Sequence, residues 1–216
     1  MAPTRRKIRY NMVNRRMNRL LVRNGLIITM DPSRRIITDG AVAIEGSKIV
    51  AVDKASKLAA FGADKVIDAK GNVVVPGFVD THHHHRESLA RGMADDVSLP
   101  VLCERLYPFD AAISEQDMYL SAMLSCIEHI RLGTTCSLDP GGPHMDAVGQ
   151  AIADSGLRGM ISYFGADFFT KDIKESQDAR AVPEYMARRS TEEVLAEEER
   201  LFRRGQARFS DDRVHE

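Results

Sequence analysis

The sequence PGFVDTHHHH occupies residues 76–85 and places four consecutive histidines directly after a short apolar run. The apolar and β-branched residues predict a strand over 78–84. Because side chains alternate between the two faces of a strand, His82 and His84 are expected to point the same way, about 7 Å apart at the backbone. His83 and His85 then point elsewhere. Two imidazoles at that spacing suit one metal ion, and a solvated loop of histidines is the alternative that spacing alone leaves open.

The residues before this run predict a small β-domain over 20–75, preceded by a basic leader over residues 1–19. The first 30 residues carry eight basic side chains and no acidic one, which favours a disordered leader or a start at Met17. Turn residues separate short β-rich runs, and EGS at 45–47 is typical of a hairpin. The expected elements are strands at 20–30, 41–45 and 48–52, a short helical or irregular piece at 54–61, and a pair of strands at 65–69 and 72–75.

The residues after Pro76 alternate between strand and helix patterns, which predicts a parallel sheet with crossover helices. A long loop with Gly92, Pro100 and Pro108 is expected after the histidines. Capping boxes at Ser114 and Ser190 predict the starts of two helices. The expected elements are helices at 114–132, 145–155 and 190–204, the last ending before Gly205, strands at 134–138 and 157–164, and an irregular polar stretch at 165–189.

Three motifs together resemble the amidohydrolase superfamily, in its branch of chlorohydrolases and aminohydrolases. GNVVVPGFVDTHHH at 71–84 resembles the first-strand signature Pro-Gly-Phe-(Val/Ile)-(Asp/Asn)-(Thr/Ala)-His-x-His. SLARGMADD at 88–96 is similar to the stretch that follows it. EHIRLGTT at 128–135 is similar to the Glu-x-Ile-x-x-Gly-Thr-Thr that opens the second strand. The resemblance covers residues 20–163, and the branch includes triazine hydrolases and nucleobase or nucleoside deaminases.

This resemblance implies an α/β fold, namely a partial (β/α)8 TIM-like barrel of about three βα units after a small β-sandwich-type module. It implies that His82 and His84 bind one divalent metal, zinc first and iron(II) second. Such a metal lowers the pKa of its bound water toward about 7. The hydroxide attacks an electrophilic ring or amidine carbon. The implied enzyme is a deaminase- or chlorohydrolase-like hydrolase of carbon–nitrogen, non-peptide bonds, acting on a small nitrogen heterocycle or amidine-like substrate.

Other polar residues have weaker claims to a role. His144 lies in a loop after the second barrel strand and is expected to contact substrate at the pocket mouth, with a loop histidine of no role as the alternative. Asp139, where that strand ends, is ambiguous in the same way. Arg91 is expected to form a surface ion pair with Asp95 or Asp96. No residue is assigned as the catalytic acid or base, and His215 is expected to lie in an exposed polar tail.

The length of the chain restricts what it does alone. A complete barrel needs about 250 residues, and the 216-residue sequence ends after about three strand–helix units. We therefore expect the amino-terminal portion of a longer amidohydrolase, with an unpaired sheet edge, an exposed apolar face and little catalysis in isolation. It is expected to form a homo-oligomer or to associate with a missing carboxyl-terminal half. The alternative is a non-catalytic metal- or partner-binding remnant of the same fold.

Composition agrees with a cytoplasmic protein. The three cysteines are widely spaced and contain no CxxC, which is typical of reduced thiols rather than a disulfide framework. No apolar run is long enough to span a membrane. The residues after the basic leader are acidic overall, so neither a nucleic-acid partner nor a membrane partner is expected.

Overall fold

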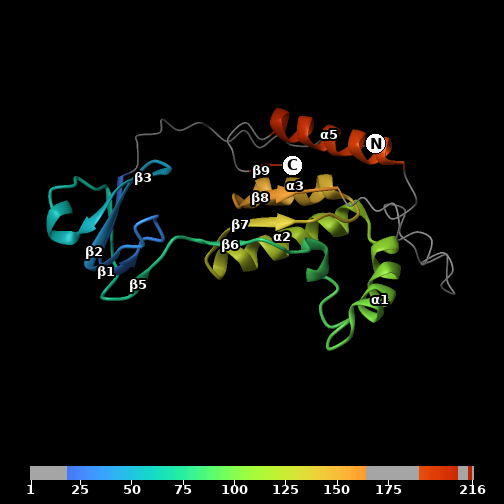
Figure 1. The fold of residues 1–216 in the computed structure, drawn as a ribbon, viewed down its shortest axis with the longest axis horizontal. Helices are drawn as coiled ribbons and strands as arrows, with labels where there is room; N and C mark the ends of the chain where they lie inside the picture. Colours follow the sequence, from blue (N-terminus) through green and yellow to red (C-terminus); the bar gives the residue numbers. More distant parts are fainter. Residues whose placement is uncertain (1–18, 164–189, 209–213, 216) are drawn as a thin grey trace, which may run out of the picture. The chain divides into compact units, whose positions relative to one another are not determined.

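The computed structural model describes residues 19–163, 190–208 and 214–215, and the chain forms two compact units that divide after Pro76 (Figure 1). All but the last residue of the expected basic leader, 1–19, lies outside the described residues, as does the polar stretch 165–189. Among the described helices, none combines the length and apolar character that crossing a bilayer requires.

The first unit is a five-stranded sheet in the order β3-β2-β1-β4, with β5 also paired to β1. Its strands are β1 (Arg19–Ile28), β2 (Ile36–Glu45), β3 (Lys48–Lys54), β4 (Lys65–Asp68) and β5 (Val73–Val74), with a 3-10 turn, η1 (Ala55–Leu58), after β3. The expected hairpin is present, and Gly46 supplies the positive φ that its turn requires. The two short strands expected as a pair each run parallel to β1 instead. Leu21, Ala41 and Ala43 form the buried centre of this unit.

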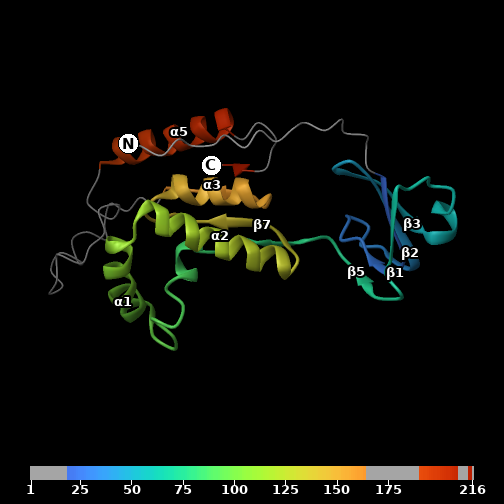
Figure 2. The ribbon, with the colours of Figure 1, turned by 180° about the vertical axis from the view of Figure 1, so that it is seen from behind.

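The second unit holds a parallel sheet in the order β6-β7-β8-β9. Its elements are β6 (Phe78–Asp80), η2 (His85–Ser88), α1 (Leu99–Ala112), α2 (Glu115–Arg131), β7 (Thr134–Asp139), α3 (Met145–Ser155), β8 (Arg158–Ile161), α5 (Thr191–Arg208) and β9 (Val214–His215). Helices lie between successive strands, so the predicted alternation and mixed α/β class are confirmed. Figure 2 shows α2 and α3 in front of β7, where they cover one face of the sheet. Their apolar residues Met118, Ala122, Val148 and Ile152 are buried there.

Local sequence signals account for the clearest helices. The Ser114 hydroxyl accepts from the Asp117 backbone N–H, and the Asp117 carboxylate accepts from the Ser114 N–H, which is the predicted capping box. The second predicted box at Ser190 has the same reciprocal hydrogen bonds with Glu193. Helix α3 has the predicted bounds and ends at Gly156, which has a φ of +81°.

Four expectations about the second unit were wrong in detail. Strand β6 ends at Asp80 rather than at residue 84, because the Asp80 carboxylate accepts from the His82 backbone N–H and turns the chain into a loop that contains the histidines. The expected loop around Pro100 and Pro108 contains α1 instead, with one proline in its first turn, where no N–H is needed, and one in its interior. Helix α5 continues past Gly205 to Arg208. The expected polar tail includes β9, which pairs parallel with β8.

The second unit also exposes apolar surface, as the sequence predicted. On α2, Leu120, Leu124 and Ile127 are all at least 40% exposed and recur at helical spacing. Strand β6 is one end of the described sheet, and its Phe78 and Val79 side chains are about 60% exposed. Large exposed apolar residues that share a face are typical of surfaces covered by another polypeptide segment.

Candidate metal and hydrolase site

The histidine loop after β6 is fixed to the carboxyl end of β7. The His83 backbone N–H donates to the Leu138 carbonyl at 2.8 Å, and the His85 backbone N–H donates to the Asp139 carboxylate at 3.0 Å. At the start of the strand, a Cβ on Gly77 would collide with the Thr135 side chain. Only glycine therefore lets β6 approach β7 closely enough to hold the loop in this place.

The four histidines divide into two groups within this loop. The rings of His82 and His84 lie edge to face with centroids 5.1 Å apart. The rings of His83 and His85 form a second pair at 4.8 Å. His82 is exposed, His84 is about a quarter exposed at its side chain, and His85 is fully buried. The two histidines expected to share a metal are thus neighbours, and their role as ligands stays a prediction.

Arg86 controls the state of the His84 ring. Its guanidinium NH1 donates to His84 Nδ1 at 2.7 Å and to the Gly141 carbonyl at 3.3 Å. Because a guanidinium only donates, His84 Nδ1 carries no proton. Burial, then the Arg86 charge, lowers the pKa of His84 to about 4. The ring is therefore neutral near pH 7, which is the form that binds metals.

The Arg86 side chain is held by a buried carboxylate on α1. Its Nε donates to both oxygens of Asp110, at 3.0 and 3.1 Å, and the Asp110 side chain has no solvent exposure. This pair connects the histidine loop to α1. Sequence reasoning missed it, because α1 was expected to be a loop and the partners are 24 positions apart.

Asp139 organises the side of the loop that holds His85 rather than the pair of His82 and His84. Its Oδ2 accepts from the His85 ring Nδ1 at 3.0 Å and its Oδ1 accepts from the Gly141 backbone N–H at 3.0 Å. Burial raises the pKa of Asp139, but the hydrogen bonds and charge of His85 outweigh it, so the pKa lies below its usual value. Asp139 Oδ1 is also 4.0 Å from His84 Nδ1. This residue, ambiguous in the sequence, is thus an ionised carboxylate at the centre of the loop.

The donor set at His82 and His84 suits zinc or iron(II), but it is incomplete within the described residues. A catalytic zinc site has three protein ligands and a water. In the described part of the chain, the only group of three or more metal-binding side chains within reach of one ion is Asp80, His83 and His129, without His82 or His84. Arg86 also occupies one nitrogen of His84. The pair of His82 and His84 therefore fits part of a metal centre and does not make a whole one.

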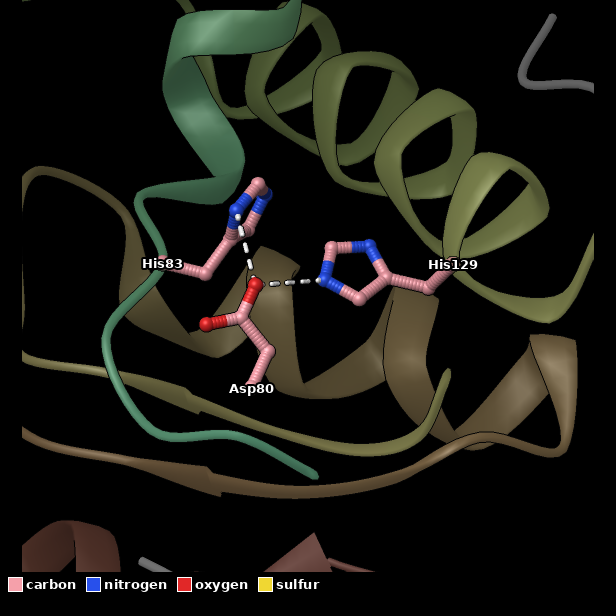
Figure 3. A group of neighbouring side chains, drawn as sticks. All are labelled: Asp80, His83 and His129. Carbon is pink, nitrogen blue, oxygen red and sulfur yellow. Dashed lines mark hydrogen bonds and ion pairs between the residues drawn. The ribbon is translucent and has the colours of Figure 1, made fainter. Parts of the chain in front are cut away.

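The group of Asp80, His83 and His129 lies between β6, the histidine loop and the last turn of α2 (Figure 3). Asp80 Oδ2 is 3.7 Å from His83 Nδ1 and 3.3 Å from His129 Nε2. Burial, then the charges of His85 and His129, lowers the pKa of His83 to about 4. Sequence reasoning did not find this group, because His129 is 49 positions from Asp80 and only the fold brings them together.

The remaining predicted residues have contacts of their own. His144 is the N-cap of α3 with a φ of +53°, and its ring Nε2 donates to the Ile113 carbonyl at 3.0 Å. Its substrate contact stays a prediction. Arg91 does not pair with Asp95 or Asp96 as expected, because its guanidinium instead bonds both oxygens of Glu128, at 2.9 and 2.7 Å.

Comparison with known proteins places this architecture in a family. The model of the Amidohydrolase family matches residues 73–214, and the chain belongs to that family. This stretch contains the whole histidine loop and nearly all of the second unit.

Relatives with assigned activities are deaminases. The chain is 38% identical over 164 residues to a 5'-deoxyadenosine deaminase of Methanosarcina mazei, covering 73% of this chain and 37% of the relative. It is 40% identical over 148 residues to a 5-methylthioadenosine/S-adenosylhomocysteine deaminase of Desulforamulus reducens, covering 68% of this chain and 34% of the relative. The chain thus spans about a third of the length of the curated relatives it matches.

Solved structures share the fold over a larger part of the chain. A triazine hydrolase from Arthrobacter aurescens superposes with a TM-score of 0.73 at 20% identity, over 92% of this chain and 45% of the other. A zinc-bound adenosine deaminase from Xanthomonas campestris superposes with a TM-score of 0.71 at 25% identity, over 91% of this chain and 41% of the other. The arrangement of strands and helices is therefore shared with less than half of each of these structures.

Proposed function

We propose that this chain supplies the first βα units, and the first two metal ligands, of a hydrolase that deaminates an adenosine-type nucleoside. The observation that carries the proposal is the neighbouring pair His82 and His84 at the carboxyl end of the parallel sheet, where enzymes of this architecture place their chemistry. Support for the substrate class comes from relatives that are 5'-deoxyadenosine and 5-methylthioadenosine/S-adenosylhomocysteine deaminases.

Bound there, a divalent metal would supply a water molecule of lowered pKa as nucleophile. Zinc is the first candidate, because two imidazoles suit it and a structural relative is an adenosine deaminase with bound zinc. Asp139 would keep the loop in place by holding the backbone and ring of His85, and His144 would face the substrate. Arg86 would have to release His84 Nδ1 in either binding mode, because the metal would take Nδ1 itself or, by taking Nε2, would move the ring proton to Nδ1.

Two ligands do not complete this centre, so we propose that the remaining ligands come from a polypeptide equivalent to the part of the relatives beyond the match. The exposed apolar residues of α2 and β6 support this, because a segment that completes the barrel would cover them. The second candidate, a binding module without catalysis, is favoured for this chain alone by the same shortage of ligands among the described residues.

A chimaera tests the proposal. Residues 20–163 of this chain replace the equivalent stretch of the Methanosarcina mazei deaminase, and ammonia release from 5'-deoxyadenosine is measured. We expect deamination that His82→Ala or His84→Ala abolishes and that the matched His83→Ala retains at least in part. A folded chimaera whose activity is unaffected by His82→Ala and His84→Ala would contradict the assignment. A folded, inactive chimaera would favour the binding module.

A further inference from the structure

We propose that Asp80, His83 and His129 form a second metal site, separate from the His82 and His84 pair, that takes a zinc-class divalent ion. The three side chains come from the end of β6, the histidine loop and α2 (Figure 3). They offer two imidazoles and one carboxylate, a donor set that zinc and other borderline divalent metals accept.

The spacing of the ligand atoms fits one shared ion. Ligand atoms about 2.0–2.1 Å from a tetrahedral zinc lie about 3.3–3.4 Å from one another. Asp80 Oδ2 is 3.3 Å from His129 Nε2 and 3.7 Å from His83 Nδ1. All three ligand atoms lie within 4.8 Å of one another. To bind one ion, the Asp80 carboxylate and the His83 ring would have to approach each other by a few tenths of an ångström. The two rings would have to approach each other by more.

The hydrogen bonds of Ser125 orient both rings toward that position. Its backbone carbonyl accepts from His129 Nδ1 at 2.8 Å, and its hydroxyl bonds His83 Nε2 at 2.7 Å. These contacts occupy the ring nitrogens that face away from Asp80. Such outer partners are what fix the tautomer and orientation of metal-binding histidines.

Both imidazole rings approach the same carboxylate oxygen of Asp80. Because a carbonyl only accepts, the Ser125 carbonyl accepts a hydrogen bond from the protonated Nδ1 of His129, and His129 Nε2 then faces Asp80 Oδ2 at 3.3 Å. The 3.7 Å approach of His83 Nδ1 is too long for a hydrogen bond to the same oxygen. A shared metal ion accounts for both approaches.

The location gives the ion a structural consequence. His129 is in the last turn of α2 and Asp80 is the last residue of β6, so the ion would cross-link the first strand to the helix that precedes the second strand. Asp80, His83 and His129 are respectively 37%, 29% and 8% exposed at their side chains, which leaves room for a water ligand on the Asp80 side. A three-ligand site with one open position is the expected form.

Equilibrium dialysis of the full chain against zinc tests the site. We expect one tightly bound zinc that persists in the His82→Ala/His84→Ala double variant. Asp80→Asn and His129→Gln should each weaken that zinc by more than about 100-fold, and Ser125→Ala by about 10- to 100-fold, the range for loss of an outer partner. In the wild-type chain the Asp80 carboxylate accepts a hydrogen bond from the His82 backbone N–H at 3.2 Å. The Asn side chain keeps an oxygen that can accept this hydrogen bond, so Asp80→Asn is the variant that disturbs the fold less.

The results that overturn the proposal are equally definite. The site does not exist if wild-type chain binds no zinc, if Asp80→Asn and His129→Gln bind it as wild type does, or if the double variant loses it. Should the variants fail to fold, imidazole nitrogen NMR of the wild type decides between metal and proton. Zinc must perturb His129 Nε2 and His83 Nδ1, and a spectrum that zinc leaves unchanged, with His129 as an imidazolium, refutes the site.

Discussion

The buried ion pair between Arg86 and Asp110 gives the sharpest stability prediction. Asp110 has no side-chain exposure and receives Arg86 Nε on both carboxylate oxygens, while the Arg86 side chain is only 12% exposed. Asp110→Asn keeps the shape but removes the buried carboxylate charge that both of these hydrogen bonds reach, while Glu87 Oε1 stays 3.7 Å from the guanidinium. Breaking such a pair costs about 3–5 kcal/mol. We expect about 3 kcal/mol, the lower end, because Arg86 keeps its hydrogen bond to the Gly141 carbonyl.

Urea unfolding followed by helical circular dichroism measures this cost. Every α-helix among the described residues lies in the second unit, so the helical signal reports that unit. With an m-value of about 2 kcal/mol/M, the midpoint should fall by about 1.5 M. The double variant Arg86→Met/Asp110→Leu should recover most of the loss, because replacing a buried ion pair by apolar groups of similar volume is often neutral for stability. A loss below about 1 kcal/mol in Asp110→Asn would show that water already screens the pair and refute the reasoning.

Three further predictions concern packing, capping and a thiol. Gly77→Ala should destabilise the second unit by about 1–3 kcal/mol, because the new methyl collides with Thr135; an unchanged urea midpoint would mean that β6 moves freely from β7. Ser114→Ala should cost about 1 kcal/mol through loss of the α2 cap, with Gln116→Ala as a matched control at an exposed helix position. Burial raises the pKa of the Cys126 thiol to about 11. The contribution of the protonated thiol to the free energy of unfolding is therefore complete below about pH 9 and declines as pH rises toward 11. The urea midpoint of wild type should therefore fall between about pH 8 and pH 10.5 by more than that of Cys126→Ala, and equal falls would contradict the burial.

Elements with strong local signals could be predicted from the sequence. Helix α3 has an apolar face and a terminal Gly156, and α2 has its Ser114 box, so each was predicted within a residue or two of its bounds. Helix α1 could not be predicted, because Pro108 usually ends a helix and its place inside one depends on tertiary packing, with Leu106 in the same helix buried. Strand β6 was predicted too long because the turn signal at its end was overlooked: the Asp80 carboxylate accepts from the His82 backbone N–H two residues on.

The candidate site could be predicted only in its local part. His82 and His84 were expected to be neighbours from strand alternation, and their rings are neighbours, although both lie in the loop after β6 rather than in a strand. The partners Asp110, Asp139 and His129 come from three other elements, and only the folded arrangement brings them to the loop. Sequence spacing carries no information about such contacts, which is why the group at Asp80 was found from the structure alone.

The histidine loop is proposed to bind two separate metal ions. The most direct test of this proposal is a count of zinc ions by native mass spectrometry in the chimaera with the Methanosarcina mazei deaminase. We predict two zinc ions in the parent chimaera, one after His82→Ala/His84→Ala and one after Asp80→Asn. Deamination should be lost in the first variant and retained in the second. Loss of both ions in either variant, or the same count in all three proteins, would contradict a loop whose alternate histidines serve two separate metals.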